Sequence, residues 1–341
     1  VILFLYLHIW YQYKTSDDLE IYSIEQPTKT KLEEICNMRQ PVIFDYYDEE
    51  IINNLNMEKM VNNFGIFDVK IREKHNNEND AIHLPFSLKE TKDLFSKDDN
   101  SKYYSENNSE FLNETVLIKK FKYNDSFLRP PLMFNCKYDF MFGSENSSSP
   151  LRYDLNFRNY YYVTEGSVKL KLIPPKFTRY LHMKRDYGNF EFISPINCWD
   201  VQEQYIKDFG KIKLLDVTLN KGEMIYIPAY WWYSIKFSNN SVVSSFKYKT
   251  VMNVLSIVPH LIMKVLQQQN IKIQKTHLVE DGNERKKRIV NETGFDETNV
   301  EKTCIVGVDT DDSGKNNVNK EKMENNLNGN VKNENTKNKK K

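Results

Sequence analysis

Few side chains in this chain stand at the spacings that metal or nucleophile chemistry needs. None of the histidines belongs to a His-x-Asp or His-x-Glu pair, the spacing by which one strand can offer a metal two ligands. The six histidines are His8, His75, His83, His182, His260 and His277. Each is most simply a surface or structural histidine, and the sequence alone assembles no three-ligand site from them.

The cysteines and glycines give no chemical motif either. The four cysteines are Cys36, Cys136, Cys198 and Cys304. They form no Cys-x-x-Cys pair and no zinc spacing, so free thiols in a reducing compartment are the simpler interpretation. Glycine is scarce, and the sequence has no phosphate-binding P-loop and no Gly-x-Ser-x-Gly nucleophile motif.

Two aromatic runs could line a pocket. They are Tyr160-Tyr161-Tyr162 and Trp231-Trp232, and Tyr162 and Trp231 are the pocket candidates. Aromatic side chains of this kind more often pack in a core or a hairpin, so both interpretations stay open.

The elements that must position these residues are mostly short strands. Between residues 138 and 248, alternating or apolar runs recur with turn residues such as Asn220-Lys221-Gly222 between them. This spacing predicts a sandwich, a jelly roll or a barrel. Residues 18–132 indicate a mixed α/β region, in which Ser87 followed by Glu90 predicts the start of a helix. Residues 250–269 return to helical periodicity.

The two ends of the chain differ from the middle. Val1–Tyr13 is almost wholly apolar and aromatic, and Lys14 follows it, which predicts a truncated transmembrane anchor. The basic flank places the domain in the cytosol, either membrane-anchored or simply cytoplasmic. After residue 274 the chain is polar and predicts a disordered tail. The net charge of +1 gives no reason to expect specific nucleic-acid binding.

The order of elements carries a family resemblance over residues 20–270. A Pro41-Val42-Ile43 strand precedes Gly166 with Pro174-Pro175, and then a block of Gly222-Glu223, Ile227-Pro228 and Trp231-Trp232. This pattern resembles the cupin-like JmjC hydroxylases, the group that includes the asparaginyl hydroxylase acting on the hypoxia-inducible factor. The run at 231–236 is also similar to a variant of this domain in giant viruses.

The resemblance implies a mainly β fold with flanking helices. Its core is a cupin-like double-stranded β-helix, or jelly roll, with an N-terminal α/β extension and a C-terminal helix. The expected divisions are 1–14 (anchor), 15–132 (α/β part), 133–249 (jelly-roll core), 250–274 (C-terminal helix) and 275–341 (disordered tail).

In the resembled family, two histidines and one carboxylate hold Fe(II) and leave room for 2-oxoglutarate and oxygen. Carried over by position, the His-x-Asp pair is Arg152 and Asp154 here, and the distal histidine is Tyr233. Arginine has no lone pair for a metal, although it could form a salt bridge with Asp154. The lysine that binds 2-oxoglutarate in some members falls at Val168. Asp154 is therefore the one remaining ligand, if a metal binds at all.

Two functions follow as hypotheses. The first is a non-catalytic pseudo-hydroxylase, a binding or scaffolding module that needs no cofactor. The alternative is a protein hydroxylase that uses Fe(II) and 2-oxoglutarate at an atypical metal site, so the sequence leaves enzyme status open. The expected partner is a protein of unknown identity. The N-terminus predicts membrane association, and the apolar face of residues 250–269 is compatible with a homodimer.

Overall fold

The computed structural model describes residues 2–73 and 83–268. The chain divides into two units, 1–282 and 283–341, and all described residues lie in the first. The tail predicted for residues 275–341 lies outside the described residues, and the predicted domain boundaries stay predictions.

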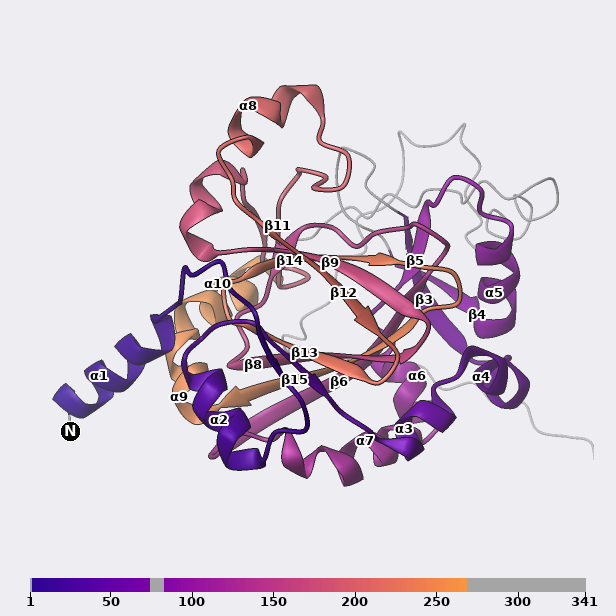
Figure 1. Cartoon of the computed structure of the whole chain (residues 1–341), viewed down its shortest axis with the longest axis horizontal. Coiled ribbons are helices and arrows are strands. Elements are labelled where there is room, and N and C mark those ends of the chain that lie inside the picture. The colour runs from indigo at the N-terminus through magenta and orange to yellow at the C-terminus, as the bar shows by residue number, and fades with distance from the viewer. Residues whose placement is uncertain (1, 74–82, 269–341) are drawn as a thin grey trace, which may run out of the picture. The chain divides into compact units, whose positions relative to one another are not determined.

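Within the described ranges, fifteen strands form two sheets (Figure 1). The larger sheet has the order β1 (Tyr22–Ile24), β2 (Val42–Asp45), β13 (Glu223–Pro228), β8 (Arg158–Glu165), β15 (Val242–Thr250), β6 (Met133–Gly143), β5 (Tyr103–Ser105), β3 (Asp68–Glu73) and β4 (Leu84–Ser87). The smaller sheet has the order β10 (Lys184–Asp186), β11 (Glu191–Ile193), β7 (Arg152–Tyr153), β14 (Trp232–Phe237), β9 (Ser167–Ile173) and β12 (Leu215–Asn220). The predicted mainly β cupin fold is confirmed.

The strand alternation of β8 shows where the two cores lie. Tyr161 and Val163 belong to the apolar cluster that also takes residues from β9 and β14, so they face the interior between the sheets. Tyr160 and Tyr162 belong to a second cluster, shared with the helices that cover the larger sheet. This follows from the pleat, which sends successive side chains to opposite faces.

Helices cover the outer face of the larger sheet, and Figure 1 shows α2, α3 and α7 along it. These helices and the smaller ones around them are α2 (Lys29–Asn37), α3 (Glu49–Asn54), α4 (Met57–Phe64), α5 (Leu88–Ser96), α6 (Ser109–Glu114) and α7 (Ile118–Asn124). Helix α8 (Ile206–Phe209) lies apart from them, and its Phe209 packs in a cluster with residues of the smaller sheet. Three short 3₁₀ segments are η1 (Asp125–Phe127), η2 (Pro175–Tyr180) and η3 (Glu203–Tyr205). The predicted cap of α5 is confirmed, because the Ser87 side chain accepts a hydrogen bond from the backbone N–H of Glu90 at 3.3 Å.

The two motif glycines sit in turns that need them. Gly166, between β8 and β9, has φ +68°, and a Cβ there would lie 3.0 Å from the carbonyl oxygen of Asn240. Gly222, between β12 and β13, has φ +95°. Both values lie in the left-handed region that glycine enters without steric cost.

The prediction of a transmembrane anchor is wrong. The apolar N-terminal run forms α1 (Ile2–Tyr13), a helix of twelve residues. Across the described residues, no helix combines the length and apolar character that a bilayer crossing requires. Instead, α1 contacts α9 (Val251–Ser256), and the Tyr13 hydroxyl donates to the carbonyl of Ser256 in that helix.

The C-terminal helical region predicted for residues 250–269 forms two helices. They are α9 (Val251–Ser256) and α10 (Val258–Gln268). The Thr250 hydroxyl caps α9 by accepting from the N–H of Asn253 at 3.3 Å. The apolar side chains Ile262, Met263, Val265 and Leu266 of α10 are 45–56% exposed.

Candidate functional site

The fold brings together the three positions where the resemblance expects metal ligands. Tyr233 on β14 stands directly opposite Arg152 on the antiparallel strand β7. Residues opposite each other on antiparallel strands share a face, and Asp154 lies two residues beyond Arg152 on that same face. All three side chains therefore point between the two sheets.

Asp154 is bound by a lysine and two tyrosines. Lys247, from β15, places its Nζ 2.9 Å from Oδ2 of Asp154. The Tyr233 hydroxyl donates to the same oxygen at 2.8 Å, and the Tyr161 hydroxyl lies 3.1 Å from that oxygen and 2.6 Å from the Tyr233 hydroxyl. Burial alone would raise the pKa of Asp154, but the charges of Lys247 and Arg152, together with the hydrogen bonds from Lys247 and Tyr233, lower it below its usual value. The carboxylate is thus charged and already has a cation.

The two tyrosines are unsuited to metal binding. Burial is the main cause that raises the pKa of Tyr233, and it also raises the pKa of Tyr161. Both hydroxyls therefore stay protonated near neutral pH and act as hydrogen-bond donors. A phenolate ligand, the one form in which Tyr233 could hold iron, is disfavoured here.

Arg152 pairs with Glu106 rather than with Asp154. Its Nη2 donates to Oε2 of Glu106, whose side chain is 2% exposed. Arg72 donates to the other oxygen of Glu106 at 2.6 Å and also binds Glu191 through two hydrogen bonds, of 3.0 and 2.7 Å. The direct salt bridge expected between Arg152 and Asp154 is not formed, because among the described residues each has another partner.

These contacts make a balanced set of buried charges. Three cations (Arg72, Arg152 and Lys247) face three carboxylates (Glu106, Glu191 and Asp154). Burial would raise the pKa of Glu106, but the charges of Arg152 and Arg72 hold it well below its usual range. Such pairs are costly to break, since either partner would be left charged and desolvated.

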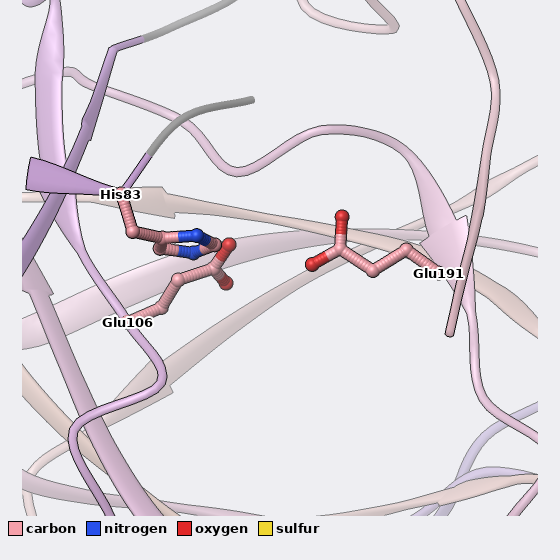
Figure 2. A group of neighbouring side chains, drawn as sticks. All are labelled: His83, Glu106 and Glu191. Atoms are coloured by element: carbon pink, nitrogen blue, oxygen red, sulfur yellow. The ribbon is translucent and has the colours of Figure 1, made fainter. Parts of the chain in front are cut away.

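One trio of described residues could hold a metal ion, next to this charged set. The ligand atoms of His83, Glu106 and Glu191 all lie within 4.8 Å of one another. Figure 2 shows the His83 ring beside the Glu106 carboxylate, with Glu191 pointing toward them from the opposite side. Burial lowers the pKa of His83, which favours the neutral imidazole that metals prefer.

The present contacts of that trio do not fit a metal. Both carboxylates are already engaged by the guanidinium of Arg72, whose side chain is 2% exposed. A divalent ion would therefore have to displace Arg72 and would add charge to a balanced set. The facial triad of the resembled hydroxylases does not fit either, because Arg152 and the protonated Tyr233 provide no ligand atoms.

The other residues that the sequence suggested for the site lie in two different apolar clusters. Val168, at the cosubstrate position, is 1% exposed and packs in the interior cluster with Tyr161. Trp231 is fully buried in the same cluster. Tyr162 faces the helices instead, where its hydroxyl accepts from the backbone N–H of Asp48 at 3.3 Å. Tyr161, rather than Tyr162, is thus the interior tyrosine.

Sequence reasoning missed the partners that complete the site. Lys247 follows the uncharged run Val242–Phe246 of β15, a signal that could have marked it as inward-facing. Arg72 has no such signal, because β3 (DVKIRE) also carries Asp68, Lys70 and Glu73. Glu106, Glu191 and His83 carry no comparable signal, because each comes from a different part of the chain and stands at a strand end or in a loop.

Comparison with known proteins agrees with this geometry. Residues 27–254 match the family described as a cupin-like domain. Similar curated proteins are the HSPB1-associated protein 1 of Bos taurus, Rattus norvegicus and Homo sapiens, each 26% identical over 103 residues. That stretch is 30% of this chain and 21–22% of the relatives, so the match spans about a fifth of their length. On the match over residues 27–254, the chain belongs to the cupin-like domain family.

Proposed function

We propose that this chain is a non-catalytic cupin-like module, a pseudo-hydroxylase whose role is to bind a protein partner. One observation carries the proposal: the arginine and lysine ion pairs occupy the place of the metal. Lys247 neutralises Asp154, and Arg152 turns to Glu106. Both carboxylates thereby have a side-chain cation where the resembled family has an ion.

The energetics of the site support the same conclusion. Iron binding would require Asp154 to exchange its ion pair and two tyrosine contacts for a metal with one protein ligand. Structural and catalytic metal sites draw their affinity from three or four protein ligands together. A lone carboxylate cannot compensate for a displaced lysine that keeps its charge inside the barrel.

Two features support a protein as the partner. The relatives are named for association with HSPB1, which makes HSPB1 a first partner to test. In addition, α10 exposes apolar side chains, and clustered exposed apolar residues commonly mark protein contacts. Light scattering of the purified chain distinguishes self-association from a need for another protein.

A second candidate function rests on the trio His83, Glu106 and Glu191. In this alternative the chain binds a divalent cation there, and Arg72 swings away to release both carboxylates. The cation could be Fe(II), which would revive hydroxylase chemistry at a site other than the resembled triad.

Metal analysis tests both candidates. The chain is incubated anaerobically with Fe(II), desalted and analysed for iron, and 2-oxoglutarate turnover is followed by succinate release. We expect iron well below one per chain and no succinate. Stoichiometric iron with succinate release would refute the pseudo-hydroxylase. Iron that binds in the wild type and is lost in His83→Ala, without succinate, would favour the cation-binding candidate. Lys31→Ala, at an exposed pair, is the matched control.

A further inference from the structure

Two further arginines lie buried on the opposite face of the larger sheet. Arg158 begins β8 and shares the face of Tyr160, which is turned toward the helices. Arg39 lies between α2 and β2. Both residues are 2% exposed. This location separates them from the charged set of the barrel interior.

Neither of these arginines has a carboxylate partner. The other two buried arginines, Arg72 and Arg152, both form ion pairs, whereas no described carboxylate lies within 4.0 Å of Arg39 or Arg158. Arginine stays charged at any pH that a protein survives. A buried charge without a counter-charge is costly, so this part of the fold has two uncompensated cations.

The buried titratable groups beside the two arginines do not supply the missing negative charge, although the half-buried carboxylate of Glu33, on α2, acts on the same thiol. The Cys36 thiol lies within the influence of both guanidiniums, and its Sγ is 3.6 Å from the Tyr160 hydroxyl. Burial nevertheless raises the pKa of Cys36 to about 11, and burial also raises the pKa of Tyr160 well above its ordinary value. Both groups are therefore neutral near pH 7.

One edge of the Arg39 guanidinium has no hydrogen-bond partner among the described residues. Its carbon lies 4.7 Å from the ring centre of Phe157 and 5.3 Å from that of Tyr11 on α1, so its faces meet aromatic rings. Its Nε and Nη2 are buried, and neither has a hydrogen-bond partner among the described residues. These two nitrogens form the side-on edge, which presents two parallel N–H groups and matches the two oxygens of a carboxylate or phosphate.

The backbone of Arg39 is also unusual. Its φ is +62°, in the left-handed region that residues other than glycine, asparagine and aspartate seldom adopt. Arg39 directly follows Met38, the C-cap of α2, and a left-handed residue commonly ends a helix at this place. This turn directs the charged side chain of Arg39 into the protein, where it is buried, although a charged side chain is more stable in contact with solvent.

We propose that Arg39 and Arg158 bind a small oxyanion, of the phosphate or carboxylate class, beneath α1. The side-on edge of Arg39 takes two of its oxygens, and the charge of Arg158 completes the neutralisation. The Arg158 carbon lies 5.4 Å from the centre of the Phe157 ring, which Arg39 also contacts. Because Tyr11 stacks on Arg39, the bound anion would also hold α1 in place.

Anion titration of the full chain tests this site. Dialysed protein is titrated with inorganic phosphate, sulfate or acetate at an ionic strength kept constant with sodium chloride. The midpoint of thermal unfolding and the heat of binding are measured. We expect at least one of these anions to raise the midpoint in a saturable way, as ligands that bind only the folded state do. Phosphate and acetate arms distinguish the two sources of oxyanion.

Variants make the assignment specific. Arg39→Gln removes the open edge, and Arg39→Lys keeps the charge without the two parallel donors. Both should weaken anion affinity roughly tenfold or more, because each loses charge-assisted hydrogen bonds. Arg179→Gln is the matched control, since Arg179 also lies over an aromatic ring, Tyr180, but is exposed.

The outcomes are decisive in both directions. A saturable effect in the wild type and in Arg179→Gln that is lost in either Arg39 variant supports the site. If Arg39→Gln does not fold, by circular dichroism, Arg39→Lys alone decides. The proposal is wrong if no anion acts beyond chloride on the wild type, or if the Arg39 variants respond as Arg179→Gln does.

Discussion

Replacing Arg152 by methionine should destabilise the chain by about 3 kcal/mol. Arg152 binds Oε2 of Glu106, and the Glu106 side chain is 2% exposed. Removing one partner of a buried pair costs about 3–5 kcal/mol, since the other charge stays desolvated and unpaired. We expect the lower end of that range because Arg72 keeps its 2.6 Å hydrogen bond to the other carboxylate oxygen. Urea denaturation followed by circular dichroism measures the change.

A double-mutant cycle isolates the pair. Glu106→Gln removes the negative charge that Arg152 binds. Arg152→Met should therefore destabilise the Glu106→Gln variant by less than it destabilises the wild type, with a difference of about 1 kcal/mol or more. The matched control is Lys31→Met. It breaks an exposed pair with Glu34 and should cost less than about 1 kcal/mol. If Arg152→Met were as stable as the wild type, or more stable, the pair would not replace a metal structurally. That result would point instead to a strained functional arginine.

Three further predictions concern the same interior and the thiols. Tyr233→Phe removes a hydroxyl that donates to Asp154 at 2.8 Å and should cost about 1–3 kcal/mol in urea denaturation; an unchanged midpoint would contradict the network. Despite burial, the folded-state pKa of Asp154 lies below its unfolded value of about 4. Its contribution to the free energy of unfolding is therefore complete above pH ~4 and is lost as the pH falls through the folded-state pKa. Acid titration of Asp154→Asn should therefore show a shallower loss of stability than the wild type. Burial raises the pKa of Cys36 and Cys198 to about 11, so in the native protein a thiol reagent followed by peptide mass spectrometry should modify the half-buried Cys136 before either of them.

The fold was predictable because its signals are local. Gly166 and Gly222 mark turns with positive φ, and the short alternating strands around them fix the sheet faces. The pairing of Tyr233 with Arg152 follows from the same motif order. These features follow from local backbone geometry, and the residue types and their alternation in a single sequence are enough to predict that geometry.

The partners of the site were less predictable because they come from distant strands. The sequence suggested that Arg152 and Asp154, two residues apart, would pair with each other. The fold instead offers each a closer opposite charge, Glu106 after β5 and Lys247 on β15. Which opposite charge each residue pairs with depends on distances between strands of the barrel. The spacing of two residues along one strand does not give those distances.

Three of the four outermost strands of the two sheets limit how a partner can bind, the fourth being the six-residue strand β12. β1 and β10 have three residues each, β10 consists of Lys184, Arg185 and Asp186, and β4 carries Pro85, which has no N–H to donate. Short, charged or proline-containing edges discourage another chain from extending a sheet by strand addition. An extended peptide would find few free backbone groups along these three edges. Recognition of a partner there would depend on side chains, and the same edges protect the protein from edge-to-edge aggregation.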